Sequence, residues 1–392
     1  MKIKLSRNVK AMGVVSFLND ASTDMVYPLI PVFLTKVLGA SLPMVGLIEG
    51  IAESTASLMK VFSGWASDKL RKRKSLTVLG YGLSMLAKPM MAFAQSPWHV
   101  LFVRFSDRVG KGIRMAPRDA LIAESTAPEN LGLAFGFHKM MDTLGAVAGP
   151  LLALILLPIL NNNIRHLFLF SFVASFFALL TLIFFVKEKK PDIHVKKEFP
   201  SLSLKLLPRH YKFFLLSLAI FTLGNSSDSF LFLRAENLGV AIGLIPVLYA
   251  LSNIVFAALA TPIGRLADII GPQKIMVGGY AVFAVTYLGF SLAPSGIFMW
   301  LLFPLYGVFS AMTDSIQKTI TVQISDPQLK GTMLGLTHTT IGLFQLPASV
   351  IAGLLWKMVG VQVPFLFGSI CAVIALLILV TTVFPKLQLV KS

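Results

Sequence analysis

Twelve mostly apolar stretches of about 20 residues or more follow one another along this chain of 392 residues. A helix of that length crosses a hydrocarbon core of roughly 30 Å. Because lipid offers the backbone no hydrogen-bonding partner, such stretches must satisfy their own N–H and C=O groups, which favours helices. The stretches are residues 10–38, 43–67, 75–94, 97–122, 132–158, 165–186, 213–235, 241–266, 275–293, 297–322, 332–356 and 363–384. We therefore expect an all-α membrane protein with twelve transmembrane helices.

The composition supports this interpretation, because 55% of the residues are hydrophobic and only 14% are charged. The basic start of the chain resembles a signal peptide. The span that follows is too long for one, contains Asp20 and Asp24, and has no small-residue cleavage site. We expect it to remain as the first transmembrane helix.

Lysine and arginine are unevenly distributed between the polar segments. If both termini are cytoplasmic, the inner segments hold 22 of the 35 basic residues and the outer loops hold four. Such an excess marks the cytoplasmic side. We therefore expect cytoplasmic termini in a multi-pass protein of the cell's inner membrane. The net charge of +17 then reflects orientation and contact with membrane lipids, with no nucleic acid as partner, and we expect a monomer.

Features of an enzyme are missing from the sequence. It has no G-x-S-x-G motif, no phosphate-binding glycine loop, and no soluble segment large enough for an ATPase. The single cysteine, Cys371, excludes an internal disulfide and a thiolate cluster. We expect no enzymatic activity and no cofactor, so active transport would draw its energy from an ion gradient, most simply of protons.

The two halves of the chain repeat each other. Gly64 and Asp68 in SGWASDKLRKRK correspond to Gly264 and Asp268 in PIGRLADIIGPQK, at a shift of 200 positions. A parallel duplication of this kind indicates a transporter in which two bundles rock about a central site. The expected parts are an N-terminal six-helix bundle (1–186), a cytoplasmic linker (187–212) and a C-terminal six-helix bundle (213–392).

The loop after the second span resembles the signature of the major facilitator superfamily. That signature, G-x-x-x-D-[RK]-x-G-[RK]-[RK], is matched by Gly64, Asp68 and Lys69, with Arg71 where the family usually has glycine. The fourth and fifth spans carry further family features, namely Arg108 followed by Gly112, and Gly145-x-x-x-Gly149-Pro150. The last pattern is similar to that of the family's antiporters. The resemblance implies the twelve-helix transporter fold and favours export.

Charged residues inside the spans lie on single helical faces. At about 100° per residue, Arg104, Asp107, Arg108, Lys111, Arg114, Arg118 and Asp119 cover an arc of roughly 140°. Similar stripes run along the first, second and fifth helices, and a charge facing lipid costs at least about 2.5 kcal/mol. We therefore expect these faces to meet in the interior. Because acidic and basic residues are nearly balanced, structural ion pairs are the leading interpretation of this interior.

Depth in the membrane separates two roles along the fourth helix. Arg114, Arg118 and Asp119, nearest the cytoplasm, are expected to be structural, latching against the loop at Asp68 as the family resemblance implies. Arg104, Arg108 and Lys111 lie deeper and are candidates for substrate binding or coupling. The guanidinium groups of Arg104 and Arg108 suit carboxylate or phosphate, so we hypothesise a substrate with anionic character.

Proton coupling requires a group that changes its protonation inside the cavity. A carboxylate removed from water holds its proton at higher pH than it does in solution, so Asp20 and Asp24 are the first candidates and Glu49 and Glu53 the second. His138 and Asp142 on the fifth helix complete the candidate set. For any single carboxylate, the alternative is that it only neutralises an arginine. The two histidines His138 and His338 allow a metal interpretation, but without an H-x-x-x-H motif we expect no metal site.

The leading hypothesis is proton-coupled export of a small organic molecule by alternating access. One rival is proton-coupled uptake of an anionic metabolite or a siderophore-like chelate. Another is a transporter fold used as a lipid translocator, receptor or scaffold, and export of iron or manganese is the least favoured. The sequence leaves the substrate and the direction of transport open.

Overall fold

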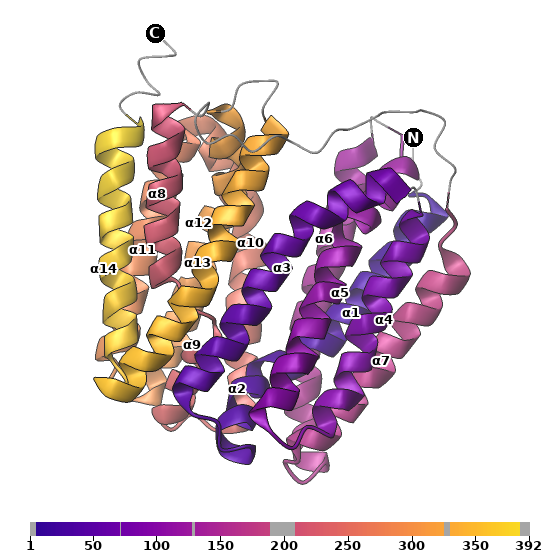
Figure 1. The fold of residues 1–392 in the computed structure, drawn as a ribbon, viewed down its shortest axis with the longest axis horizontal. Helices are drawn as coiled ribbons and strands as arrows, with labels where there is room; N and C mark the ends of the chain where they lie inside the picture. The colour runs from indigo at the N-terminus through magenta and orange to yellow at the C-terminus, as the bar shows by residue number, and fades with distance from the viewer. Residues whose placement is uncertain (1–4, 71, 128–129, 189–207, 325–329, 385–392) are drawn as a thin grey trace. The chain divides into compact units, whose positions relative to one another are not determined.

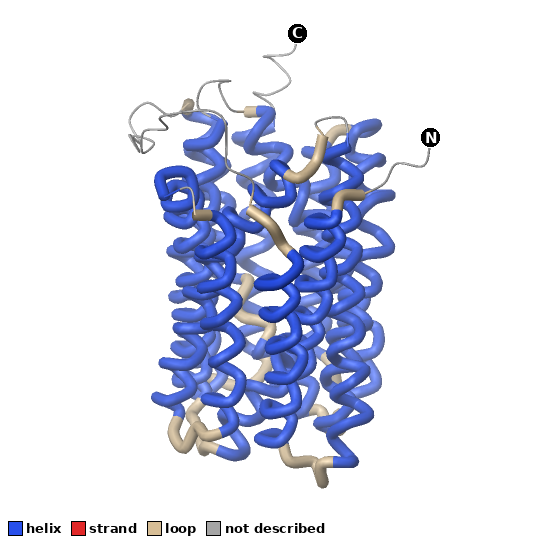
Figure 2. The backbone as a smooth tube through the Cα atoms, turned by 90° about the vertical axis from the view of Figure 1, so that its right-hand side faces the viewer, coloured by secondary structure: helices blue, strands red, loops and turns tan. Residues whose placement is uncertain are grey.

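The computed structural model describes residues 5–70, 72–127, 130–188, 208–324 and 330–384. Within these ranges all regular structure is helical, as Figure 2 shows. Every predicted span is matched by one helix or by a broken helix, so the all-α prediction is confirmed (Figure 1). The ends differ from the predicted ones by a few residues.

The first half begins with α1 (Arg7–Val26), whose span continues through the short turns η1 (Tyr27–Leu29), α2 (Ile30–Val32) and η2 (Phe33–Val37). The helices that follow are α3 (Leu42–Leu70), α4 (Arg73–Ala92), α5 (Pro97–Glu124), α6 (Leu131–Ile159) and α7 (Ile164–Phe185). Serine hydroxyls cap two of these helices: Ser6 accepts from the Val9 N–H at 3.3 Å, and Ser96 from the His99 N–H at 3.4 Å. These caps satisfy N–H groups that have no partner within the helix.

The second half begins with a broken span, α8 (Arg209–Gly224) and α9 (Ser229–Asn237). It continues with η5 (Ile242–Leu244), α10 (Ile245–Ile270), α11 (Pro272–Leu292), η6 (Gly296–Phe298), α12 (Met299–Gln323), α13 (Lys330–Met358), α14 (Val363–Ile378) and η7 (Leu379–Val383). Gly271 joins α10 to α11 with a φ of +94°, a conformation that favours glycine.

Two spans that the sequence predicts as continuous are irregular. Pro28 and Pro31 lack the N–H that a helix interior needs, so the regular helix ends at Val26 and gives way to the short turns. The seventh span is interrupted at residues 225–228, the sequence Asn-Ser-Ser-Asp. Short polar side chains compete for backbone groups there, and the Ser227 N–H bonds to the Ser349 hydroxyl at 3.2 Å instead of continuing the helix.

By length and composition, eight of the described spans are long enough and apolar enough to cross a membrane. The others are the first span, α3, α4 and α5, which carry most of the charged residues predicted to lie in the interior. Polar groups are therefore concentrated in the first half of the chain.

The described residues fold into two compact units. Unit 1 comprises those of residues 1–39, 55–199 and 242–250, and unit 2 those of residues 40–54, 200–241 and 251–392. Each unit therefore contains most of one half and a short piece of the other. The expected bundle boundaries at 186 and 213 stay predictions.

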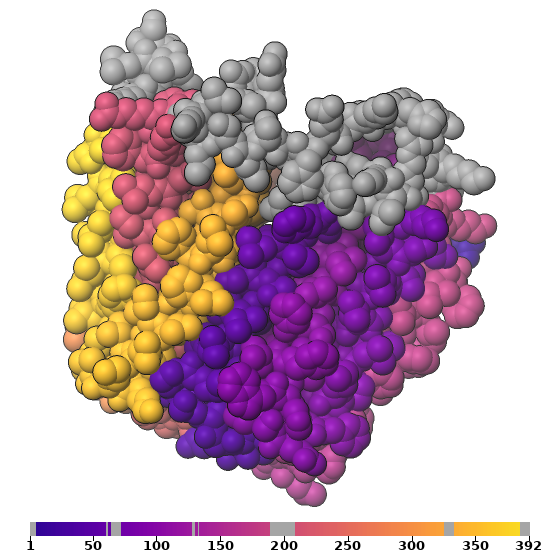
Figure 3. Space-filling model, viewed as in Figure 1, coloured from indigo at the N-terminus to yellow at the C-terminus, as the bar shows by residue number. Residues whose placement is uncertain are grey.

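Glycines explain why the start of α3 belongs to unit 2. A methyl group on Gly46 would lie 2.2 Å from the carbonyl oxygen of Ser349 on α13, and one on Gly353 would lie 2.5 Å from that of Leu42. In Figure 3 the indigo surface at the lower end of α3, the part that belongs to unit 2, lies against the orange surface of α13. Without side chains at these positions the two backbones can touch.

Two arginines, the half-buried Arg165 and the buried Arg234, bind the carbonyl groups at the ends of corresponding helices. In unit 1, Arg165 donates from Nη1 to the carbonyls of Ala92 and Ala94, both at 2.7 Å, at the end of α4. In unit 2, Arg234 donates to carbonyls at the end of α11. The oxygens it contacts are those of Phe290 at 3.0 Å, Ser291 at 3.3 Å and Ala293 at 3.1 Å. Helix ends leave such carbonyls without partners, so these arginines stabilise the fold.

Replacing Arg234 tests this role. The side chain is 3% exposed, so Arg234→Met leaves carbonyl groups buried without a donor and should lower the free energy of unfolding by about 3 kcal/mol or more. Arg265→Met, on an exposed position of α10, is the control and should be neutral. Unfolding midpoints in detergent measure both, and equal midpoints would contradict the assignment.

Candidate functional site

The candidate site of unit 1 starts from a close contact between α1 and α6. A methyl group on Gly145 would lie 2.5 Å from the carbonyl oxygen of Phe17, and one on Gly149 would lie 2.5 Å from that of Ala21. Overlap with backbone atoms at this distance cannot be relieved by turning a side chain. The Gly145-x-x-x-Gly149-Pro150 pattern therefore lets α6 touch α1 along two turns.

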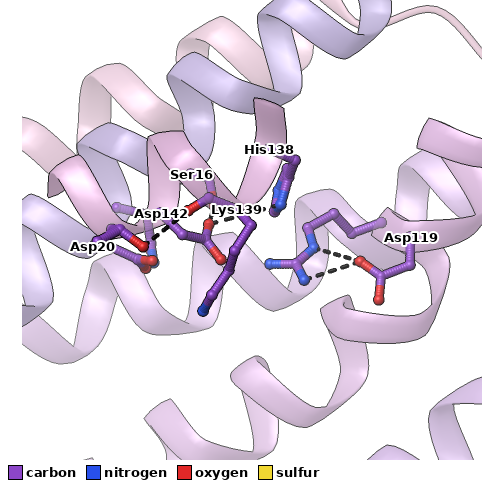
Figure 4. A network of polar contacts seen from close by, with 9 residues as sticks. Ser16, Asp20, Asp119, His138, Lys139 and Asp142 are labelled. Atoms are coloured by element: carbon purple, nitrogen blue, oxygen red, sulfur yellow. Dashed lines mark hydrogen bonds and ion pairs between the residues drawn. The ribbon is translucent and has the colours of Figure 1, made fainter. Parts of the chain in front are cut away.

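One turn before Gly145, this contact brings polar side chains of α1 and α6 together (Figure 4). The hydroxyl of Ser16 on α1 donates to Oδ1 of Asp142 on α6. Nδ1 of His138, which lies one turn before Asp142 on α6, is 3.8 Å from the same oxygen. Asp20 accepts a hydrogen bond from Nδ2 of Asn19 at 3.0 Å and faces the same group, and we call Ser16, Asp20, His138 and Asp142 the α1–α6 cluster.

Next to this cluster lies an ion pair within α5. Nε and Nη2 of Arg118 both lie 2.9 Å from Oδ1 of Asp119. Figure 4 shows Asp119 beyond His138, with Lys139 extending beside Asp142. Asp119 therefore neutralises a guanidinium whose charge acts on His138.

A second group, deeper in unit 1, joins α1, α4 and α5. Nζ of Lys88 donates to the Thr23 hydroxyl at 3.1 Å. The guanidinium carbons of Arg104 and Arg108 lie 5.5 and 5.8 Å from the ring centre of Tyr27, within the range of a cation–π interaction. Lys88, Arg104 and Arg108 are each at most 6% exposed. We call these residues and Asp107 the Tyr27 cluster.

A small cavity of about 20 Å³ lies within the Tyr27 cluster. Its polar lining comes from Thr23, Tyr27, Lys88, Arg104 and Asp107. This volume is enough for about one water molecule. The cavity is too small for an organic solute in this conformation, so these side chains would have to separate for such a solute to bind.

Electrostatic interactions connect the two clusters. Asp20 and Asp142 repel each other, and Asp24 is attracted to Lys111, Lys88 and Arg108. Lys111 attracts Asp20 as well. A change of charge in one cluster therefore changes the electrostatic energy of the charged groups in the other.

Arg114 contacts residues of α4, and the structural role expected of it stays a prediction. Its Nη1 donates to the Ser84 hydroxyl at 2.5 Å, and its guanidinium carbon lies 4.4 Å from the ring centre of Tyr81. The expected latch to Asp68 concerns a side chain outside the described part, as do Gly64 and Lys69, of which only the helical backbone in α3 is described.

The remaining candidates belong to unit 2. Glu49 is fully buried and Glu53 half-buried, and both lie on the part of α3 that belongs to unit 2. The expectation that the stripe of the second helix joins those of α1, α5 and α6 therefore stays a prediction. Gly264 has open space around it and Asp268 is exposed on α10. Among the residues that the structure describes, no three His, Cys, Asp or Glu side chains gather in a way that could hold a metal ion.

Two charged residues of the Tyr27 cluster are missing from the site predicted from the sequence. The sequence marks Lys88 and Asp107 only as charges inside the spans, yet they line the cavity beside Tyr27. Asp107 stands three positions after Arg104, on the same face of α5, which is a usable signal. Lys88 is isolated in an apolar stretch of α4, and no pattern in the sequence pairs it with Thr23.

The sequence model of the Major Facilitator Superfamily matches residues 12–233 and 214–390. The chain belongs to the major facilitator superfamily. It is therefore a multi-pass membrane protein and a secondary transporter, and it is not an enzyme.

Individual relatives agree with this assignment. An uncharacterised transporter of the superfamily from Methanocaldococcus jannaschii is 40% identical over 96% of this chain and 95% of its own. The multidrug resistance protein MdtG of Proteus mirabilis is 25% identical over 80% of each chain. Among solved structures, the nucleoside transporter NupG superposes with a TM-score of 0.82 at 12% identity, covering 95% of this chain and 99% of its own, which shows the shared fold.

The glycine contact between α1 and α6 is testable. Gly149→Ala places a methyl group against the backbone of Ala21, so the helices must separate, and we expect about 1–3 kcal/mol of destabilisation. Gly136→Ala, elsewhere on α6 with open space around it, should be neutral or slightly stabilising because alanine favours helix. Denaturant titration in detergent compares them. Two variants of equal stability would show that the contact is not tight.

Proposed function

We propose that this transporter couples proton movement to the export of small organic molecules across the cell's inner membrane by alternating access. The observation that carries the proposal is the α1–α6 cluster, where the glycine contact brings Asp142 to Ser16 and Asp20, with His138 beside Asp142. Groups that can gain and lose protons are thereby held in the interior of a secondary transporter. The relation to a multidrug resistance protein supports export.

The charges of the two clusters determine how solute and proton would affect each other. While Asp24 is ionised, it attracts Arg108 and Lys111. A cationic solute group would compete with a proton for the same carboxylates, so binding one expels the other, as antiport requires. An anionic group would instead bind best when the carboxylates are protonated and the basic side chains are released.

The Tyr27 cluster therefore favours a second candidate, proton-coupled uptake of an anionic metabolite. The guanidinium groups of Arg104 and Arg108 are buried against Tyr27, and arginine forks bind carboxylate and phosphate well. Under this alternative an anion and a proton move in the same direction. The sign of the coupling thus discriminates between export by antiport and uptake by symport.

Proteoliposomes containing a pH-sensitive dye test both candidates. Organic cations, organic anions, lipids and divalent metals are added in turn, and solute-dependent proton movement is recorded. Proton movement opposite to the solute supports export by antiport, and movement with an organic anion supports the second candidate. Loss of the signal in Asp20→Asn or Asp24→Asn would show that the carboxylates of α1 take part in the coupling. Solute flux or lipid flipping without any proton movement would refute proton coupling.

Arg108→Lys tests the role of the guanidinium in solute binding. Lysine keeps the positive charge and loses the planar fork, so transport of an anionic solute should fall by about tenfold or more. Arg265→Lys on the exposed face of α10 is the control. Unchanged flux of every transported solute when Arg104 and Arg108 are both replaced by glutamine would exclude them from solute binding.

A further inference from the structure

His138 has an unusual environment for a histidine inside a membrane helix. The residue is 4% exposed, and its Nε2 is buried without a hydrogen-bond partner. Its other ring nitrogen, Nδ1, lies 3.8 Å from Oδ1 of Asp142. A buried ring nitrogen without a partner is normally avoided, which indicates a role beyond packing.

The two nitrogens limit which protonation states fit this geometry. If Nδ1 carries the proton it faces the Asp142 carboxylate as a donor, and Nε2 is a bare acceptor. If Nε2 carries the proton instead, the lone pair of Nδ1 faces Oδ1, which is favourable only when Asp142 is protonated. Both arrangements keep one proton between Nδ1 and Oδ1 and differ by one proton on Nε2. The pair can therefore gain or lose one proton without losing its internal contact.

The surroundings of Asp142 make this proton exchange sensitive to nearby charges. Ser16 stabilises the ionised carboxylate by donating to Oδ1, whereas Asp20 repels it. Arg118 is held by Asp119 at 2.9 Å. The charged or titratable groups that interact with the pair are Asp20 on α1, Tyr81 on α4, Arg118 and Asp119 on α5, and Lys139 on α6. Lys111 and Arg114 on α5 interact with Asp20.

We propose that the His138–Asp142 pair on α6 is the proton-binding site of the transport cycle, taking up and releasing one proton per cycle. This inference rests on the proposed proton coupling and specifies the group that carries the proton. Asp142 is 18% exposed at its side chain and His138 is 5% exposed, so the carboxylate is the more accessible of the two groups. The state with the extra proton carries one proton on Nε2 and one between Nδ1 and Oδ1, and Asp20 responds to the change in charge.

Infrared difference spectroscopy tests the pair without any solute. The purified full chain in lipid nanodiscs is taken across physiological pH, and the carboxyl C=O band is followed. The wild type should show a titrating band that Asp142→Asn removes, and His138→Gln should shift the midpoint of the band. Asp314→Asn and His166→Gln, both on exposed positions, should change neither. A band unaltered by Asp142→Asn, or a midpoint unaltered by His138→Gln, would overturn the proposal.

Ser16→Ala provides a variant that removes only a hydroxyl. It deletes the donor to Oδ1 and should shift the same band if Asp142 is the titrating group. An unchanged band in Ser16→Ala would contradict the assignment even if Asp142→Asn failed to fold.

Transport separates this proposal from the proposed function. With a solute identified by the dye assay, Asp142→Asn should retain exchange of labelled for unlabelled solute but lose transport driven by a pH gradient. Gradient-driven transport that persists in Asp142→Asn overturns the assignment to this pair while proton coupling stands. A wild type that moves no protons with any solute refutes the coupling, whereas the infrared spectra still test whether the pair binds a proton.

Discussion

The exclusion of unpaired charge from a membrane interior is the constraint on which this structure depends. An ion without a partner there costs several kcal/mol, so each basic side chain of α4 and α5 must be held by a carboxylate, a ring or a polar group. Lys88 contacts Thr23, Arg104 and Arg108 lie against Tyr27, and Arg118 is held by Asp119. The arrangement of unit 1 follows from this need for internal partners.

Small residues make that arrangement possible. Gly145 and Gly149 bring α6 onto α1, and the same approach places Asp142 beside Ser16. Without it the carboxylate would lack its donor, and His138 would lack a carboxylate held in place. Packing and chemistry are thus connected, because the glycines that let the helices touch also build the group of side chains that can exchange protons.

Much of the fold follows from the sequence because hydrophobic length alone specifies transmembrane helices. The twelve spans were predictable for that reason, whereas the break at residues 225–228 was not, since it depends on Ser349, 122 positions from Ser227. The stripes on α1, α5 and α6 were also predictable from the helical period. Periodicity assigns a side chain to a face without assigning its partner on another helix, so the contacts of Lys88 with Thr23 and of Asp142 with Ser16 required the structure.

The most direct test of the account is the number of protons exchanged when a solute binds. Calorimetry in buffers of different ionisation enthalpy measures that number for the detergent-solubilised protein, with tetraphenylphosphonium as an organic cation and benzoate as an organic anion. Proton coupling through the His138–Asp142 pair predicts that the protein releases protons when it binds the cation or takes up protons when it binds the anion. The Asp142→Asn variant should exchange no protons on binding. Solute binding with the same heat in every buffer would mean that the wild type exchanges no proton, and would contradict proton coupling.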